Sequence, residues 1–257
     1  MTGASVGFLF GHQLREYLRF RRMAIWILVA IVLVVTTVAF RQVNPSQTRQ
    51  DTYILLSGII VFRLLALAAA ILATGVVSQE VEQKTIVYLL TRPVPRWKYL
   101  LARTGAAMVA TFIVSLLAAV AVSLAVYGQL GTMFWRDVPA LAAGSAAYVS
   151  LFTLFSLLVN RAMIVCLLFA FGWELAIPNL GGDIYLLSIN SYLTAIARHP
   201  APSGGTDLLD ILGGLGGTNA LSANFAWMLA MGVTLVSLVF GVTWFSKKEY
   251  VPRDDAE

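Results

Sequence analysis

Long runs of apolar residues dominate the chain, and the polar residues gather between them. A helix needs about 20 apolar residues to cross roughly 30 Å of hydrocarbon. The runs lack the period-two alternation of a transmembrane β-strand, and lipid would leave open sheet edges without hydrogen-bond partners. The pattern therefore predicts an all-α membrane protein with six transmembrane spans, at residues 23–40, 54–77, 99–127, 138–159, 162–180 and 224–246.

Residues 1–22, before the first run, have the pattern of an amphipathic helix. At about 100° per residue, Phe10, Leu14, Tyr17 and Leu18 share one face. The opposite face carries His12, Arg15, Arg19 and Arg22. Such a helix is expected to lie in the membrane interface, and the alternative is a simple positively charged anchor. The first run is longer than the apolar core of a signal peptide, so it is expected to remain as a span.

Composition agrees with a membrane protein. Of the 257 residues, 59% are hydrophobic and only 12% are charged. A disordered chain needs the opposite balance, and a soluble domain carries about twice this share of charge. The single cysteine excludes an intrachain disulfide framework and a site built from several cysteines.

The positive charges predict an orientation. With six spans both termini lie on one side, and 13 of the 18 Lys and Arg residues lie there with them. Four lie on the other side, and Arg63 lies inside the second span. Short cytoplasmic loops are rich in Lys and Arg, so both termini are predicted to be cytoplasmic. The net charge of +5 is then explained by anchoring at an anionic membrane surface, without nucleic acid.

The segment 78–98 is the longest predicted cytoplasmic connection. Its first half is expected to be a short helix, with Glu80 and Glu82 in the first turn, where the helix dipole favours carboxylates. Pro93 and Pro95 end that helix. A short, rigid helix between two spans suits the transmission of force from a soluble partner, whereas a solvated loop is the plainer interpretation.

The external segment 181–223 is too long for a simple turn. It holds eight of the 20 glycines, and its pattern predicts a short helix at 206–212. That helix either shapes an external gate or merely fills the connection. Pro178 is expected to break the end of the fifth span.

Two ionisable residues fall inside predicted spans, where an unpaired charge is costly. Arg63 lies about 14 Å from the outer surface, and Glu174 lies about 12 Å from it, at 1.5 Å of helix rise per residue. The similar depths suggest that Arg63 and Glu174 pair with each other or face a polar cavity. A packing interaction without a ligand is the alternative.

Several motifs for ATP binding, metal binding and catalysis are missing from the sequence. No Gly-Lys pair occurs, so this chain carries no P-loop for ATP. The two histidines, His12 and His199, are predicted to lie on opposite sides of the membrane, and no metal-binding or hydrolase motif is present. Cys166 is expected to be a packing residue. The sequence therefore predicts a protein without a catalytic or metal site of its own.

The segment 78–103 carries a family resemblance. It reads Glu80-x-Glu82-x-Lys84-Thr85, Leu89-Leu90-Thr91-Arg92-Pro93-Val94-Pro95-Arg96, and Tyr99-Leu100-Leu101-Ala102-Arg103. This pattern, together with six spans and an amphipathic first helix, resembles the ABC-2-type transporter permeases, which have a type V exporter-like fold. The chain departs from the family at Lys84, where glycine is usual.

The resemblance implies the membrane subunit of an ATP-driven exporter. Two cytoplasmic ATPase subunits would hold ATP and Mg²⁺, and a second copy or a related permease would complete the pathway. The segment 78–92 would be the coupling helix, with partner contacts at Glu80, Glu82, Thr85, Tyr88, Arg92 and Arg96. The expected location is a prokaryotic inner membrane. The alternatives are an ion-coupled secondary transporter or channel, and a membrane scaffold without a transported substrate.

Overall fold

A computed structural model describes residues 4–45, 47–76, 95–177, 183–199 and 221–247. These residues form helices and short connections, and no strand occurs among them. In chain order the elements are α1 (Ala4–Tyr17), α2 (Phe20–Val43), α3 (Arg49–Leu56), the π-helical turn η1 (Ser57–Val61), α4 (Phe62–Thr74), α7 (Arg96–Tyr127), α8 (Thr132–Leu158), α9 (Ala162–Leu168), the π-helical turn η2 (Phe169–Trp173), α10 (Glu174–Ala176), the 3₁₀-helix η4 (Asp183–Leu187), α11 (Ile189–Ala197) and α13 (Ala223–Lys247).

Five helices are long and apolar enough to cross a membrane. They overlap the predicted first, second, third, fourth and sixth spans, at Phe20–Val43, Arg49–Thr74, Trp97–Tyr127, Thr132–Leu158 and Ala223–Lys247. The predicted fifth span corresponds to a shorter apolar helix, Ala162–Ala176. An all-helical membrane protein is therefore established, while the sixth crossing stays a prediction. The segment 78–92 lies outside the described residues, and so does the predicted coupling helix.

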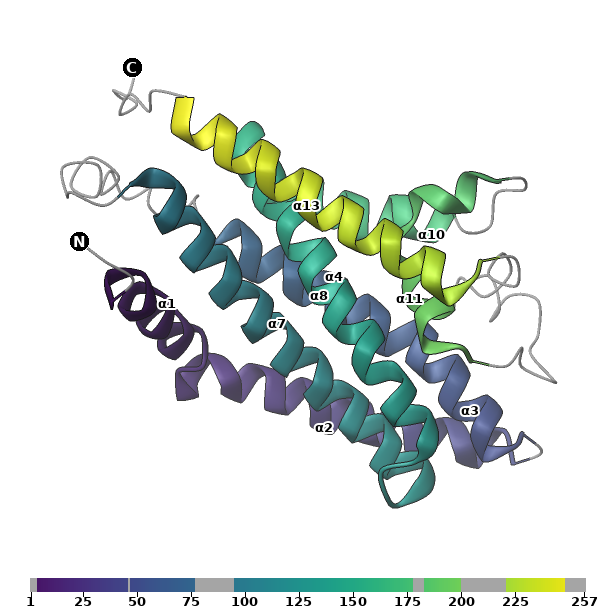
Figure 1. Ribbon diagram of the computed structural model, residues 1–257. Coiled ribbons are helices and arrows are strands. Elements are labelled where there is room, and N and C mark those ends of the chain that lie inside the picture. The colour runs from purple at the N-terminus through teal and green to yellow at the C-terminus, as the bar shows by residue number, and fades with distance from the viewer. Residues whose placement is uncertain (1–3, 46, 77–94, 178–182, 200–220, 248–257) are drawn as a thin grey trace, which may run out of the picture.

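Helix α8 lies at the centre of the bundle and contacts α4, α7, α11 and α13 (Figure 1). Its buried face is rich in small residues, which let neighbouring helices approach closely, as is usual between membrane helices. Gly144 shows how close this approach is. A Cβ atom at this position would lie 2.5 Å from Leu65 Cδ2 of α4 and 2.8 Å from Leu193 Cδ2 of α11. The core of the bundle is thus built where α4, α8 and α11 meet.

Helix α2 lies at the edge of the bundle, against α7. Most of its apolar side chains are exposed, among them Ile25, Leu28, Ile31, Val32 and Val35. Exposed apolar faces of this extent are rare on soluble proteins, but they are what lipid tails contact in a membrane. The outer surface of the bundle is therefore suited to hydrocarbon.

The N-terminal helix is amphipathic in the predicted sense. In α1 the side chains of Phe10, Leu14 and Tyr17 pack against the core, and the Tyr17 hydroxyl donates to the Leu72 carbonyl oxygen at 3.4 Å. The helix ends at Tyr17 and does not continue to residue 22. Arg19 has an extended backbone, with ψ at 136°, and α2 begins at the next residue.

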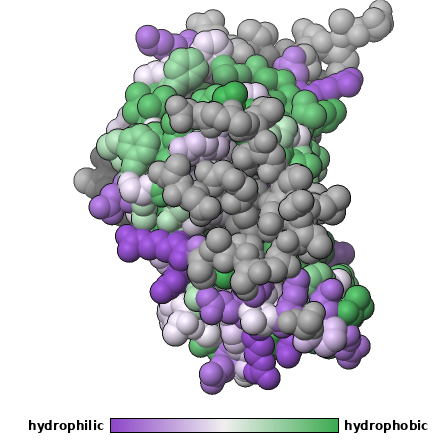
Figure 2. All heavy atoms as spheres, turned by 90° about the vertical axis from the view of Figure 1, so that its right-hand side faces the viewer, coloured by the Kyte–Doolittle hydropathy of each residue, from purple (hydrophilic) through white to green (hydrophobic). Residues whose placement is uncertain are grey.

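The bundle has two distinct ends (Figure 1). The beginning of α1, the beginning of α7 and the end of α13 lie at one end, while α3, α11 and the turn between α7 and α8 lie at the other. That turn begins at Gly128, whose φ of 75° is readily adopted only without a side chain. Figure 2 looks onto this second end, where hydrophilic residues gather in the lower part and hydrophobic residues above.

The segment 181–223, predicted to be external, contains a helix that its pattern did not predict. All nine residues of α11 are buried, and the helix packs against α8 and α13. The predicted helix at 206–212 lies outside the described residues. This segment therefore contributes one buried helix, α11, to the bundle.

Candidate functional site at the two ends of helix α11

A buried carboxylate lies at the N-terminal end of α11. Glu174 begins α10 and is only 1% exposed. Its Oε2 accepts hydrogen bonds from Ser188 Oγ at 2.5 Å and from the Asn190 amide at 3.0 Å, and its Oε1 accepts one from the Ile189 amide at 3.0 Å. Three donors and the positive end of a helix dipole offset the cost of burying this acid.

The local sequence explains why this end forms. Ser188 has an extended backbone, and its hydroxyl accepts a hydrogen bond from the Ser191 amide, which is the usual arrangement of a serine N-cap. The same hydroxyl donates to Glu174, so one side chain joins the cap to the acid. The Glu174 carboxylate therefore fixes the start of α11 against α10, the helix that carries Glu174.

Arg63, the other predicted intramembrane charge, approaches the same region from α4. Its Nη1 donates to the Ala170 carbonyl oxygen at 3.3 Å, and Ala170 lies one helical turn before Glu174. The buried Tyr148 of α8 lies within electrostatic reach of both Arg63 and Glu174. Both predicted residues therefore act electrostatically on one buried tyrosine, and a direct pair between them stays a prediction.

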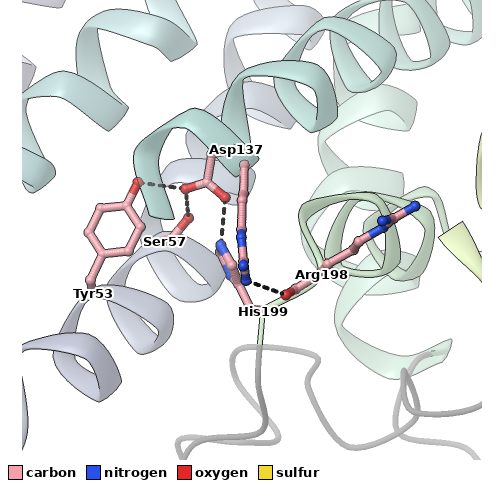
Figure 3. Close-up of polar contacts among 6 residues, drawn as sticks. Tyr53, Ser57, Asp137, Arg198 and His199 are labelled. Carbon is pink, nitrogen blue, oxygen red and sulfur yellow. Dashed lines mark hydrogen bonds and ion pairs between the residues drawn. The ribbon is translucent and has the colours of Figure 1, made fainter. Parts of the chain in front are cut away.

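A second buried carboxylate lies at the C-terminal end of α11 (Figure 3). Asp137 of α8 is 0% exposed. Its Oδ2 accepts hydrogen bonds from Tyr53 Oη at 2.6 Å and Ser57 Oγ at 2.8 Å. His199 Nε2, two residues beyond α11, lies 2.8 Å from Asp137 Oδ1, at ion-pair distance but without the alignment of a hydrogen bond. The acid joins α3, α8 and the end of α11.

The backbone beside this cluster is held by a further contact. Arg198 caps the C-terminal end of α11 in the left-handed conformation, with φ at 51°. Its carbonyl oxygen accepts a hydrogen bond from Arg136 Nη1 at 3.3 Å. Neighbouring residues of α8 therefore hold neighbouring residues of the α11 end, since Arg136 contacts Arg198 and Asp137 contacts His199.

Each π-helical turn adjoins the polar contacts. Ser57, which donates a hydrogen bond to Asp137, is the first residue of η1, and Arg63 lies two residues after the end of that turn. Ala170, which accepts a hydrogen bond from Arg63, lies in η2, and Glu174 is the first residue after η2. Such turns widen a helix and occur often at functional sites. Here they present polar groups to the interior of an apolar bundle.

All but one of the predicted partner-contact residues lie in a segment that the structure does not describe. Glu80, Glu82, Thr85, Tyr88 and Arg92 lie outside the described residues. Arg96 is the first residue of α7. Within the part of the chain that the structure describes, no three His, Cys, Asp or Glu side chains gather as a metal site would require.

The sequence pattern did not identify Asp137 and His199 as a pair. Span four was predicted to begin at Val138, which left Asp137 outside it, whereas α8 begins at Thr132. His199 was assigned to an external loop. One signal was present in the sequence: Tyr53 and Ser57 lie four residues apart, on one face of a helix, and so present two hydroxyl groups to the same neighbour.

The fold and its buried polar contacts define the class of the protein, which is a multi-pass, all-helical membrane protein. Residues 15–179, from the end of α1 to just beyond α10, match the family described as ABC-2 family transporter protein. The match covers more than half of the chain, and the chain belongs to this family. The resemblance at residues 78–103 is thereby confirmed. No curated protein matches the chain.

Family membership makes the protein an ABC permease, a membrane subunit for transport. The matched region contains Asp137 and Glu174 but ends before α11, and so before the amides of Ile189 and Asn190 that donate to Glu174. The family segment therefore supplies two acids, and the remainder of the chain supplies the helix that they hold.

Proposed function

We propose that the protein is the membrane subunit of an ATP-driven exporter in a prokaryotic inner membrane. One observation carries the proposal: the family match begins at the end of the N-terminal helix and covers four helices long enough to cross a membrane and the whole of 78–98, in a chain without a P-loop. ABC-2 permeases generally work with an ABC ATPase subunit, so ATP and Mg²⁺ belong to that partner. Two copies of the ATPase and a second permease subunit would complete the transporter.

In this proposal the segment 78–92 is the coupling helix. Glu80, Glu82, Thr85, Tyr88, Arg92 and Arg96 contact the ATPase. The charge pattern and the arrangement of the bundle support this side as cytoplasmic, because the beginning of α1, the beginning of α7 and the end of α13 lie at one end. ATP binding in the partner would then move the helices that follow and precede this segment, α7 and α4.

Arg63 and Glu174 are proposed as intramembrane pathway residues. Their support is that Glu174 holds the start of the buried helix α11, while Arg63 contacts Ala170 one turn before Glu174. A displacement of α11 relative to α4 would change what surrounds these charges. The placement of these two charges beside a buried helix favours a role in opening and closing a pathway over a role in catalysis.

The ATPase partner is tested by purification of the full-length tagged chain from its own host in mild detergent. We expect a P-loop ATPase to co-purify. Replacing both Glu80 and Glu82 with lysine should remove most of the bound ATPase. The matched control replaces Gln42 and Gln50 with lysine, because both are exposed at the opposite end of the bundle. ATPase binding that survives the first pair of changes, or is lost with the second, would contradict the coupling assignment.

The direction and the pathway need a transport assay. In inside-out vesicles, an exporter should accumulate substrate only when ATP is added outside. Arg63→Gln should lower substrate-stimulated ATPase activity more than Arg63→Lys, because lysine keeps the charge. Uptake driven by an ion gradient without ATP would instead identify an ion-coupled transporter.

A further inference from the structure

A pocket of about 450 Å³ opens between the C-terminal end of α11 and the N-terminal end of α13. Its polar walls come from Thr194, Arg198, His199, Ser222 and Asn224. No Asp or Glu is among the described residues that line it. The described walls of the pocket therefore offer hydrogen-bond donors and positive charge.

Arg198 is the main charge of this pocket. Its side chain points away from the Asp137 cluster, towards α13 (Figure 3). The guanidinium contacts no carboxylate among the described residues, and the residue is exposed. Its left-handed backbone is unusual for a residue with a side chain. The contact from Arg136 to the Arg198 carbonyl holds this conformation.

Asp137, the described acid beside the end of α11, is already engaged. Asp137 accepts hydrogen bonds from Tyr53 and Ser57 through one oxygen and lies against His199 through the other. Arg198 has no share in these contacts. Asp137 therefore does not neutralise the Arg198 guanidinium, and the described residues at this end of α11 keep an excess of positive charge.

Helix α13 adds to this charge. The Ser222 hydroxyl accepts a hydrogen bond from the Phe225 amide at 3.4 Å, and the first-turn amides of a 25-residue helix begin beside Arg198 in the pocket wall. The start of a helix carries a partial positive charge that attracts anions, phosphate above all. An exposed arginine and a helix start thus line one pocket from opposite sides.

The surroundings match the boundary between lipid headgroups and tails. Phe225 and Met228 are exposed apolar residues in the first two turns of α13, and Trp227 lies between them. Tryptophan is enriched at membrane interfaces, where its ring meets both environments. A phosphate in the pocket would therefore have room for its acyl chains along α13.

We propose that this pocket binds the phosphate group of an anionic phospholipid, with Arg198 as the main contact. Free phosphate shares the same chemistry, and the experiment distinguishes the two sources. The inference concerns the end of the bundle opposite to the beginning of α7, and it depends neither on an ATPase partner nor on the direction of transport.

The test uses the full-length protein in detergent and native mass spectrometry. The probes are dioctanoyl phosphatidylglycerol, dioctanoyl phosphatidylcholine and inorganic phosphate. We expect phosphatidylglycerol to bind more tightly than the zwitterionic lipid. Arg198→Asn should weaken it about tenfold or more, because one charge-assisted contact is lost. Asparagine tolerates the left-handed conformation, so this change is compatible with the fold. Arg198→Lys should restore much of the binding.

Two further variants keep the result interpretable. Asn224→Asp puts a negative charge in the pocket at a helix start, where a carboxylate favours folding, and it should also weaken phosphatidylglycerol binding. Arg49→Gln removes an exposed arginine at the same end of the bundle and should change nothing. Binding of inorganic phosphate that depends on Arg198, without a gain from the lipid tails, would support the anion site and assign it to a soluble phosphate. Equal binding of both lipids in all variants would overturn the proposal.

Discussion

The two ends of α11 are both held by buried carboxylates, but they are built differently. At the first end, Glu174 accepts hydrogen bonds from Ser188, Ile189 and Asn190, which lie 14 to 16 positions away along the chain. Asp137 accepts its two hydrogen bonds from side chains 80 and 84 positions away. The first is a local cap made largely with backbone amides, and the second is a junction of three separate segments made with side chains.

This difference separates two physical roles. Backbone amides at a helix start must find an acceptor, because lipid and protein core supply no water. The Glu174 contacts therefore serve the formation of α11 itself. The Asp137 contacts involve side chains that helix formation does not require. Because they join α3 and α8 to His199, we interpret them as contacts that set the position of the end of α11. We expect the first end to dominate stability and the second to influence position.

Removing the acceptor at the first end should have the largest effect. Glu174→Ala leaves one hydroxyl and two amides without their partner, and we expect a loss of about 3–5 kcal/mol of folding free energy. The measurement is the thermal midpoint in detergent, with the monodisperse yield from size-exclusion chromatography. Glu174→Gln keeps one acceptor oxygen and should lose less. An unchanged midpoint for Glu174→Ala would mean that α11 does not need this cap.

Gly144 tests the packing between the two ends. Gly144→Ala brings a methyl group to 2.5 Å from Leu65 and 2.8 Å from Leu193, so side chains of α4 and α11 must shift. We expect a loss of about 1–3 kcal/mol, measured as the same midpoint. The matched control is Gly232→Ala in α13, where nothing lies within 4 Å, and it should stabilise its helix by up to about 1 kcal/mol. Equal effects would show that the approach at Gly144 is not tight.

Tyr53 tests the second end. Tyr53→Phe removes one donor to Asp137 without changing the ring, and should cost about 1–2 kcal/mol, the range of hydrogen bonds between membrane helices. Tyr127 packs beside Tyr53 at 5.6 Å between ring centroids, and its hydroxyl has no hydrogen-bond partner among the described residues. Tyr127→Phe is therefore the control. A larger effect for Tyr127→Phe would contradict the Asp137 junction.

His199 should give the smallest effect. Its contact with Asp137 lacks hydrogen-bond alignment, so His199→Gln is expected to cost less than about 1 kcal/mol. A double-mutant cycle with Asp137→Asn measures the coupling between the two residues, expected near 0.5 kcal/mol. If His199→Gln destabilised the protein as much as Glu174→Ala, the two ends of α11 would not differ as described.

The sequence anticipated the first end better than the second. Glu174 stands inside an apolar run, and a buried acid there needs donors, so its importance follows from the pattern alone. Asp137 stands just before an apolar run, and nothing in the run shows that the helix begins five residues earlier. The residues Asn190, Ser191 and Thr194 make α11 look like a surface segment, yet all three are buried.

The sequence by itself determined the membrane class, the approximate course of the apolar helices and the family, because lipid accepts only long apolar helices with internally paired backbones. It also determined the inward face of α1. Only the tertiary structure decided that α11 is buried, that Asp137 meets His199, Tyr53 and Ser57, and that Arg198 faces the start of α13. These contacts join residues far apart in the chain, and their partners are chosen by packing around α8, which no local pattern records.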